Sequence, residues 1–335
     1  MLQFDLALVW AGFVAFFVIM YVVMDGFDLG IGILFPFARS DADRDLMMNS
    51  VAPIWDGNET WLVLGGTSLL AAFPIAYSVL LPAFYLPLFV MLLALIFRGV
   101  SFEFRFKSIE NRHWWDRAFT FGSMAATFAQ GVVLGSFILG VKVTDRQYSG
   151  GAFSWFTPFA LFCGLALMAG YAMLGAGWLI GKTTGELQDW AYHKMRVVGL
   201  LVLAAVAIVS LWTPLIHSEV AARWFTWPNI LYLSPVPILV LLAGVRLYLA
   251  LERREHWSPF FLTLALFLLS YGGLAISLFP YVIPPSITIW DAASPPSSQI
   301  FLLVGVAIIT PIILTYTFWN YWVFRGKVTP DQHYH

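Results

Sequence analysis

Apolar runs about as long as a lipid bilayer is thick follow one another along almost the whole chain of 335 residues. A run of about 20 apolar residues can cross the hydrocarbon core as an α-helix, because a helix satisfies its own backbone hydrogen bonds where water is absent. Hydrophobic residues make up 60% of the sequence and charged residues only 11%. A membrane β-barrel would instead show shorter segments of alternating polarity. The sequence therefore predicts an all-α polytopic membrane protein.

Nine transmembrane helices follow from the residues that interrupt the apolar runs. The predicted spans are residues 6–36, 52–74, 78–97, 118–140, 156–180, 197–215, 231–250, 258–280 and 300–323. We expect a single transmembrane domain over residues 1–335, with a first four-helix bundle in 1–150, a second in 151–298, and a peripheral helix and cytoplasmic tail in 299–335. The first span has no cation before it and no small-residue cleavage site after it, which predicts a retained anchor rather than a cleaved signal.

A weak sequence echo links the two predicted bundles. Glycine-punctuated stretches end the first span, at residues 25–32, and the fifth, at residues 175–185. Glycine lets helices approach closely in a membrane, so we expect the end of the first span to pack tightly against its neighbours. Whether the echo reflects an internal duplication is left open by the sequence.

The distribution of cations predicts the orientation in the membrane, because short cytoplasmic loops collect Lys and Arg. Of the 18 Lys and Arg residues, only Lys142, Arg146 and Arg223 fall on one side of the nine predicted spans. All the others fall on the opposite side. We therefore expect a periplasmic N-terminus and a cytoplasmic C-terminus.

Four acidic residues lie among the first two apolar runs: Asp25, Asp28, Asp56 and Glu59. An ionised Asp near the bilayer centre costs roughly 2.5 to 3.5 kcal/mol, so such a residue usually faces a protein interior, a partner or a water-filled path. Each pair has a spacing of three residues, which puts both carboxylates of the pair on one helix face. All four are expected in the cytoplasmic half of the membrane. A line of carboxylates there could pass protons inward from the cytoplasm.

Structural interpretations compete with this one. Asp56 could be the N-cap of the second span, with Glu59 at the third helical position of a capping box. Arg98 and Glu103, at the cytoplasmic end of the third span, could be an interfacial anchor and its ion pair. For Asp28, between glycines, the main alternative is a structural ion pair.

Histidine is absent from all nine predicted spans. The six histidines are His113, His193, His217, His256, His333 and His335. A membrane subunit that holds its own haems normally offers His within its spans, because imidazole is the usual axial ligand. The sequence also carries no Cys cluster, zinc signature or nucleotide-binding glycine loop. If the protein takes part in redox chemistry, another subunit should carry the metal.

The acidic stretches also carry a family resemblance. Asp25-Gly26-Phe27-Asp28 and Trp55-Asp56-Gly57-Asn58-Glu59 closely resemble subunit II of the cytochrome bd-type terminal quinol oxidases, including the cyanide-insensitive branch. Segments 71–77, 97–105, 279–284, 288–292 and 311–316 resemble the same family in the same order. The resemblance therefore spans the chain.

The resemblance implies a haem-free subunit of an enzyme in the bacterial cytoplasmic (inner) membrane. In that family, subunit I binds two b-type haems and one d-type haem and oxidises quinol on the periplasmic side, and the complex reduces oxygen to water without pumping protons. Subunit II is its nine-helix, pseudo-symmetric partner in a heterodimer. A structural quinone and a small single-helix accessory subunit are further expectations from the family. No metal, catalytic residue or nucleic-acid partner is expected in this chain.

The resemblance also assigns roles to individual residues. It places Asp25, Asp28, Asp56 and Glu59 on or beside the proton path. Some family members carry Gln where Glu59 stands, so Glu59 is not expected to be essential. The motifs also contain four polar or aromatic residues with an expected structural or interface role, namely Trp55, Asn58, Arg98 and Glu103.

Two other functions stay open on the sequence. A secondary transporter would also carry intramembrane carboxylates and glycine-interrupted helices. However, it should have acidic residues in both halves, and spans five to eight offer no acidic counterpart. A purely structural oxidase scaffold would differ only in denying the carboxylates a role in proton transfer.

Overall fold

Long helices make up most of the molecule, as a computed structural model of the chain shows for residues 5–108 and 110–329. The long helices are α1 (Leu6–Leu34), α3 (Trp55–Ala72), α4 (Pro74–Lys107), α5 (Arg112–Leu139), α6 (Pro158–Lys182), α7 (Gly185–Ile216), α10 (Pro235–Glu252), α11 (Ser258–Leu278) and α13 (Pro296–Val323). The predicted all-α polytopic class is confirmed.

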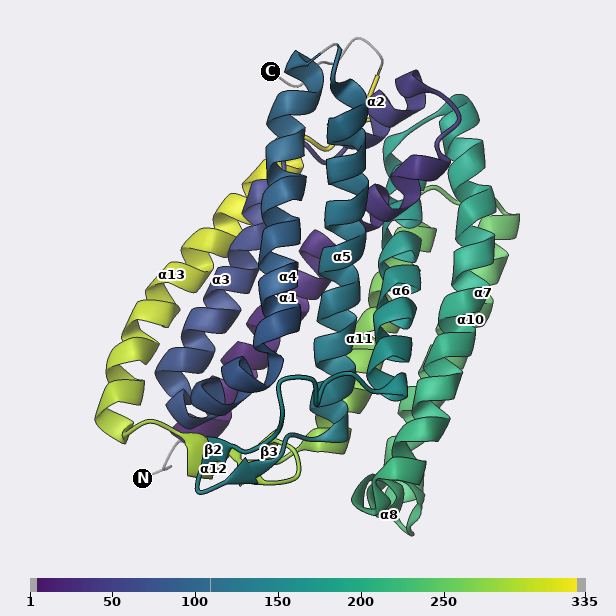
Figure 1. The fold of residues 1–335 in the computed structure, drawn as a ribbon. Helices are drawn as coiled ribbons and strands as arrows, with labels where there is room; N and C mark the ends of the chain where they lie inside the picture. The colour runs from purple at the N-terminus through teal and green to yellow at the C-terminus, as the bar shows by residue number, and fades with distance from the viewer. Residues whose placement is uncertain (1–4, 109, 330–335) are drawn as a thin grey trace.

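Short elements cap the two ends of the helix bundle (Figure 1). The end at which α4 ends and α5 begins also holds the short helix α2 (Asp41–Asn49), which follows the 3-10 turn η1 (Phe35–Phe37). The opposite end holds α8 (Ser218–Phe225), α9 (Asn229–Leu233) and α12 (Ile289–Ala292). It also holds two antiparallel hairpins, β1 (Val143–Thr144) with β2 (Gln147–Tyr148), and β3 (Tyr281–Ile283) with β4 (Ile287–Thr288).

Eight helices in the described part of the chain are long and apolar enough to cross a membrane. Each corresponds to a predicted span, although α4 and α7 extend further toward the cation-rich end than predicted, because their last and first turns are polar. The remaining predicted span corresponds to α3, which is 18 residues long. Its polar first turns, which contain Asp56, Asn58 and Glu59, keep it outside the group of eight.

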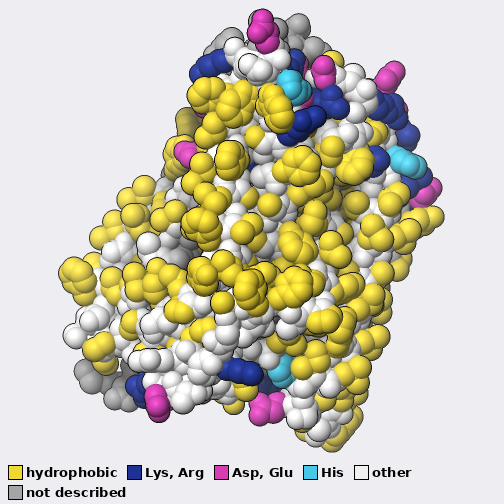
Figure 2. All heavy atoms as spheres, viewed as in Figure 1, with side chains coloured by type: hydrophobic (Ala, Val, Ile, Leu, Met, Phe, Trp, Pro, Cys, Tyr) yellow, Lys and Arg dark blue, Asp and Glu magenta, His cyan; other side chains and the backbone are white. Residues whose placement is uncertain are grey.

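Charged side chains gather at the two ends of the molecule and leave an apolar band between them (Figure 2). In this view most of the Lys and Arg side chains lie at the end formed by α2 and the adjacent ends of α4, α5 and α7. An apolar band between polar ends is the surface that a membrane-spanning protein presents to lipid.

Helices α1 and α6 cross at glycines in the middle of the structure. Gly30 of α1 and Gly175 of α6 lie against each other, and a Cβ atom at Gly30 would overlap the carbonyl oxygen of Tyr171. The two glycine-punctuated stretches that echo each other in the sequence therefore meet in space. Next to this crossing, Phe27 stacks on Trp178 with ring centroids 4.3 Å apart, which extends the contact between the two helices.

We expect Gly30→Ala to destabilise the protein by about 3 kcal/mol, since the added methyl group meets backbone rather than a movable side chain and overpacking costs about 1–3 kcal/mol. The free energy of unfolding of the purified protein in detergent measures the effect. Gly12→Ala on the same helix is the control, because a Cβ atom there has no neighbour within 4 Å. Equal stability of the two variants would contradict the crossing.

Candidate functional site

Arg98 of α4 is the centre of a buried cluster of charged side chains. Its side chain is 0% exposed, and its Nη1 atom lies 2.8 Å from Asp25 Oδ1 and 2.8 Å from Glu59 Oε1. The Nη2 atom lies 3.7 Å from Asp28 Oδ2. Three of the four predicted carboxylates thus surround one guanidinium group.

Three helices bring these groups together. Asp25 and Asp28 share one face of α1, as their spacing predicts, and on this face Asp28 contacts Asn58 of α3. Glu59 lies on the second turn of α3, and Arg98 reaches in from α4 about three turns before that helix ends. Because α3 packs on α1 and α4 packs on α3, the four side chains converge at one level of the bundle.

Two hydrogen bonds in series connect Asp28 to α13. Asn58 Nδ2 donates to Asp28 Oδ2 at 2.7 Å, and the hydroxyl group of Tyr321 donates to Asn58 Oδ1 at 2.8 Å. Tyr321 belongs to α13, so these hydrogen bonds connect α13 to α3 and α1. This role of Tyr321 is not predictable from the sequence, because a lone Tyr near a span end is typical of an interfacial aromatic residue.

The cluster is short of hydrogen bonds and of positive charge. The contact between Arg98 and Asp25 is close but lacks hydrogen-bond geometry, and neither carboxylate oxygen of Asp25 has a hydrogen-bond partner among the described residues. The same holds for Asp28 Oδ1 and for Nε and Nη2 of Arg98. Buried polar groups are nearly always paired, so such a group of unpaired atoms marks a place for water, protons or a partner.

Asp56 lies beside this cluster and not within it. Its side chain is exposed at the second position of α3, close enough to Glu59 to interact with it electrostatically. The capping-box interpretation is wrong: the N-cap of α3 is Ile54, whose side chain makes no capping hydrogen bond. Glu59 points toward Arg98 instead of its own helix terminus, because the guanidinium group is the stronger partner.

The aromatic rings of Trp55 and Phe102 lie against the guanidinium group of Arg98. Their rings stack with centroids 5.0 Å apart, and the Arg98 Cζ atom lies 5.8 Å and 5.9 Å from the two ring centres. The predicted interfacial pair of Arg98 with Glu103 is wrong. Glu103 is exposed and pairs with Lys107 at 2.9 Å, since it faces away from the buried side of α4.

A second ion cluster lies two turns further along α4. The buried Arg105 contacts Asp45 of α2 at 2.6 Å and also pairs with Asp116 of α5. Arg112 pairs with the same Asp45. Here two cations balance two carboxylates, so this cluster is neutral and fastens α2 to the bundle. The sequence analysis missed it, because all four residues lie where ordinary loop charges were expected.

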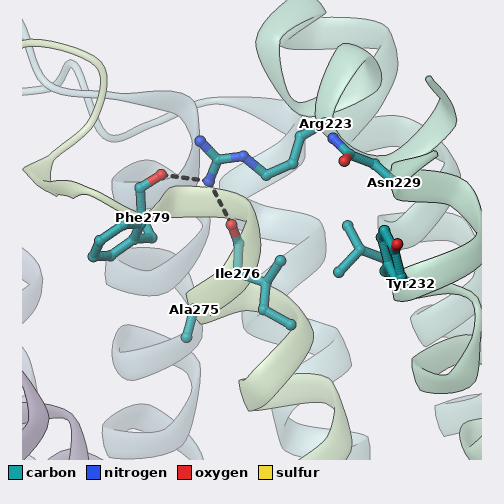
Figure 3. A pocket seen from close by; sticks show the side chains of 7 residues that line it. Arg223, Asn229, Tyr232, Ala275, Ile276 and Phe279 are labelled. Carbon is teal, nitrogen blue, oxygen red and sulfur yellow. Dashed lines mark hydrogen bonds between the residues drawn. The ribbon is translucent and has the colours of Figure 1, made fainter. Parts of the chain in front are cut away.

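A surface cleft lies at the opposite end of the bundle (Figure 3). Its volume is about 500 Å³, and it is lined by side chains from α8, α9 and the end of α11. Arg223 at its rim donates hydrogen bonds to the carbonyl oxygens of Ile276, at 2.5 Å, and Phe279. The cation therefore caps the C-terminus of α11, and the rest of the lining is mainly apolar.

None of the four histidines among the described residues is buried in the helix bundle. His113 and His256 lie at helix ends or in a loop, and His217 Nε2 lies 2.8 Å from the carbonyl oxygen of Ile138. His193 lies within α7, which begins earlier than predicted, but it is exposed. His333 and His335 fall outside the described residues. Within residues 5–108 and 110–329, no three His, Cys, Asp or Glu side chains are grouped to hold a metal ion.

Comparison with known proteins identifies the family. The model of the family "cytochrome bd terminal oxidase subunit II" matches residues 6–324. The chain belongs to this family. This subunit II is 31% identical to subunit 2 of the cytochrome bd-I ubiquinol oxidase of Escherichia coli (strain K12), over 98% of this chain and 96% of the relative. It is 27% identical to subunit 2 of the cytochrome bd ubiquinol oxidase of Bacillus subtilis (strain 168), over 96% and 97% of the two chains.

A solved structure shares the fold. The bd oxidase from Geobacillus thermodenitrificans superposes with a TM-score of 0.76 at 17% identity, over 97% of this chain and 100% of the other. The resemblance seen in the sequence is confirmed. This chain is a subunit of a quinol oxidase, an oxidoreductase, and the transporter interpretation is not supported.

We expect Arg98→Gln to lower the free energy of unfolding by about 3–5 kcal/mol, because it leaves buried carboxylates without their cation. Unfolding in detergent measures this loss. Adding Asp25→Asn removes one of the stranded charges and should recover part of the loss, so the two effects should not add. Strict additivity, or a loss below about 1 kcal/mol, would show that Arg98 does not hold the cluster together.

Proposed function

We propose that this subunit II is the haem-free partner of a haem-bearing subunit I and supplies protons from the cytoplasm for the reduction of oxygen. The observation that carries the proposal is the charge imbalance around Arg98: Asp25, Asp28 and Glu59 surround one buried guanidinium group. Removal from water disfavours uncompensated charge, so one guanidinium group cannot keep all three carboxylates ionised. The cluster therefore holds at least one exchangeable proton.

Glu59 is the link between the surface and the buried carboxylates. Its side chain is 24% exposed, whereas those of Asp25 and Asp28 are 0% exposed. Glu59 and Asp25 approach the same Nη1 atom at 2.8 Å, so these two oxygens are no further apart than twice that distance. One water molecule can bridge such a gap. A proton taken up near the exposed Asp56 can pass through Glu59 to Asp25 and Asp28.

The proposed orientation places this path on the cytoplasmic side. Asp25 and Asp28 lie in the last third of α1 and Glu59 lies in the second turn of α3, so the cluster is nearer the cation-rich end of these helices. Cytoplasmic ends collect Lys and Arg. With α3 as a ninth span beside the eight apolar helices, the N-terminus is periplasmic and the C-terminus cytoplasmic. We also propose the division into bundles of residues 1–150 and 151–298, followed by the peripheral α13.

The exposed face of α3 fits a protein partner better than lipid. Asp56, Gly66 and Thr67 are exposed along this face, together with Val63 and Leu70. A carboxylate facing lipid is costly, whereas small residues allow close packing between helices in a membrane. We therefore place subunit I against this face. The exposed Asp56 then lies at the subunit interface, next to the access point of the proton path.

The haems and substrates belong to the complex. The two b-type haems and the d-type haem are placed in subunit I, where they supply electron transfer and oxygen chemistry. Quinol and oxygen are substrates of the whole complex, which resides in the bacterial inner membrane. A structural quinone and a single-helix accessory subunit stay predictions from the family, and we assign no residues to them.

We expect Asp25→Asn to lower quinol-driven oxygen uptake at least about tenfold, because it removes a proton-carrying group from the path. The haem spectrum of the purified complex should stay unchanged. Glu103→Gln is the matched control, since it neutralises an exposed carboxylate on α4 away from the cluster, and its uptake should equal that of the wild type. An altered haem spectrum or lost assembly in Asp25→Asn would favour the purely structural scaffold.

We expect Gly66→Leu to reduce the yield of the subunit I complex several-fold in affinity purification. A Cβ atom at Gly66 has no neighbour within 4 Å in this chain, so the larger side chain obstructs only what docks on α3. Gly272→Leu on α11 is the control, because that site is equally open within the chain but lies on another helix. Normal complex yield from Gly66→Leu would place subunit I elsewhere.

A further inference from the structure

A chain of buried hydrogen bonds runs from the Asp25 region into the second half of the molecule. Gln130 Nε2 of α5 donates to the hydroxyl oxygen of Tyr21 at 2.8 Å, and the hydroxyl group of Tyr171 of α6 donates to Gln130 Oε1 at 2.9 Å. Tyr21 is 5% exposed and Tyr171 is 0% exposed. None of the three residues has a role in the proton path described above.

Tyr21 is the residue through which this chain reaches Asp25. It lies one turn before Asp25 on the same face of α1, which is the spacing at which helical side chains meet. The two groups are close enough to interact. Because Tyr21 accepts a hydrogen bond from Gln130, its own O–H is free to donate, and neither Asp25 oxygen has a hydrogen-bond partner among the described residues.

Glycines in α1 allow this chain to form. A Cβ atom at Gly26 would lie 2.9 Å from the ring of Tyr171, so any larger residue would push that ring away from α1. The same crossing at Gly30 fixes the backbone of Tyr171. Asp25 and Gly26 thus have complementary roles. Asp25 is the buried acid, and Gly26 leaves room for the ring of Tyr171 from α6.

The donors and acceptors in the chain suit both protonation states of Asp25. With Asp25 ionised, Tyr171 donates to Gln130 and Gln130 donates to Tyr21, as the structure shows, and the Tyr21 O–H can turn to donate to the carboxylate. With Asp25 protonated, the acid O–H donates to Tyr21, whose hydroxyl proton turns to Gln130. A flip of the Gln130 amide group then presents its oxygen to Tyr21 and its NH2 group to Tyr171. Hydroxyl and amide groups can reverse in this way because each carries both a donor and an acceptor.

We propose that Tyr21, Gln130 and Tyr171 are positioning residues that stabilise Asp25 in both protonation states and so set the ease with which a proton reaches and leaves it. The proposal rests on proton transfer through Asp25, as proposed above. The other groups that face Asp25 are Arg98 and Glu59, from α4 and α3, and Asp28 on its own helix. The Arg98 guanidinium group can only donate, and the carboxyl groups exchange the proton themselves, whereas the Tyr21 hydroxyl group can both donate to Asp25 and accept from it without changing its own charge.

Infrared difference spectroscopy of the purified complex tests the proposal. The carbonyl stretch of protonated Asp25 is the band lost in Asp25→Asn. Tyr21→Phe should shift this band, because the acid loses its hydrogen-bond acceptor, and should slow oxygen uptake by about tenfold, as expected for loss of one hydrogen bond to a charged group. Tyr171→Phe should shift the band less. Tyr271→Phe is the matched control, since it removes a 2.9 Å hydrogen bond to the backbone of α1 at Ala15 and should leave both readouts unchanged.

The outcomes separate this proposal from the proposed function. A shifted band with unchanged oxygen uptake supports the positioning of Asp25 and contradicts proton delivery through it. An unchanged band in Tyr21→Phe overturns the positioning role, whatever the oxygen uptake. If Tyr21→Phe does not assemble, Gln130→Met removes the amide group that orients Tyr21 and should give the same shift in the band.

Discussion

The structure depends on one buried guanidinium group in a region rich in carboxylates. Arg98 draws Asp25 and Asp28 of α1 and Glu59 of α3 to a single point, so one side chain fixes how three helices are rotated about their axes. One cation does not balance three carboxylates, and several of their atoms lack hydrogen-bond partners among the described residues. A purely structural ion pair would be balanced, as the cluster around Arg105 is.

Close packing at glycine makes this arrangement possible. The α1–α6 crossing at Gly30 and Gly175 joins the two halves of the chain within two residues of Asp28 on α1. The stacked rings of Phe27 and Trp178 continue the contact. Since lipid gives helices little hydrophobic reason to associate, such close contacts and buried polar pairs supply the specificity that a soluble core obtains from burial. The acidic residues and the glycines of the stretch 25–32 therefore depend on each other: the glycines allow the close helix packing that positions the carboxylates.

The sequence predicted the helices and several site residues, but it did not predict their pairing. Hydropathy located each long helix, and the family motif pointed to Asp25, Asp28, Glu59 and Arg98. Which charges meet depends on helix rotation, which local spacing does not fix, so the pairing of Glu103 with Arg98 is wrong. The alternative capping role of Asp56 is wrong because α3 begins before Asp56. Residues such as Gln130 and Tyr321 could not be found at all, because each lies far along the chain from its partners.

The rate of proton uptake during a single turnover tests the central claim most directly. The complex is reconstituted in liposomes, and the charge movement that accompanies oxygen reduction is recorded together with the haem absorbance. With Asp25→Asn, we expect slower charge movement, while electron transfer among the haems before proton uptake keeps its wild-type rate. Charge movement as fast as in the wild type, in both Glu59→Gln and Asp25→Asn, would contradict a proton path through this subunit.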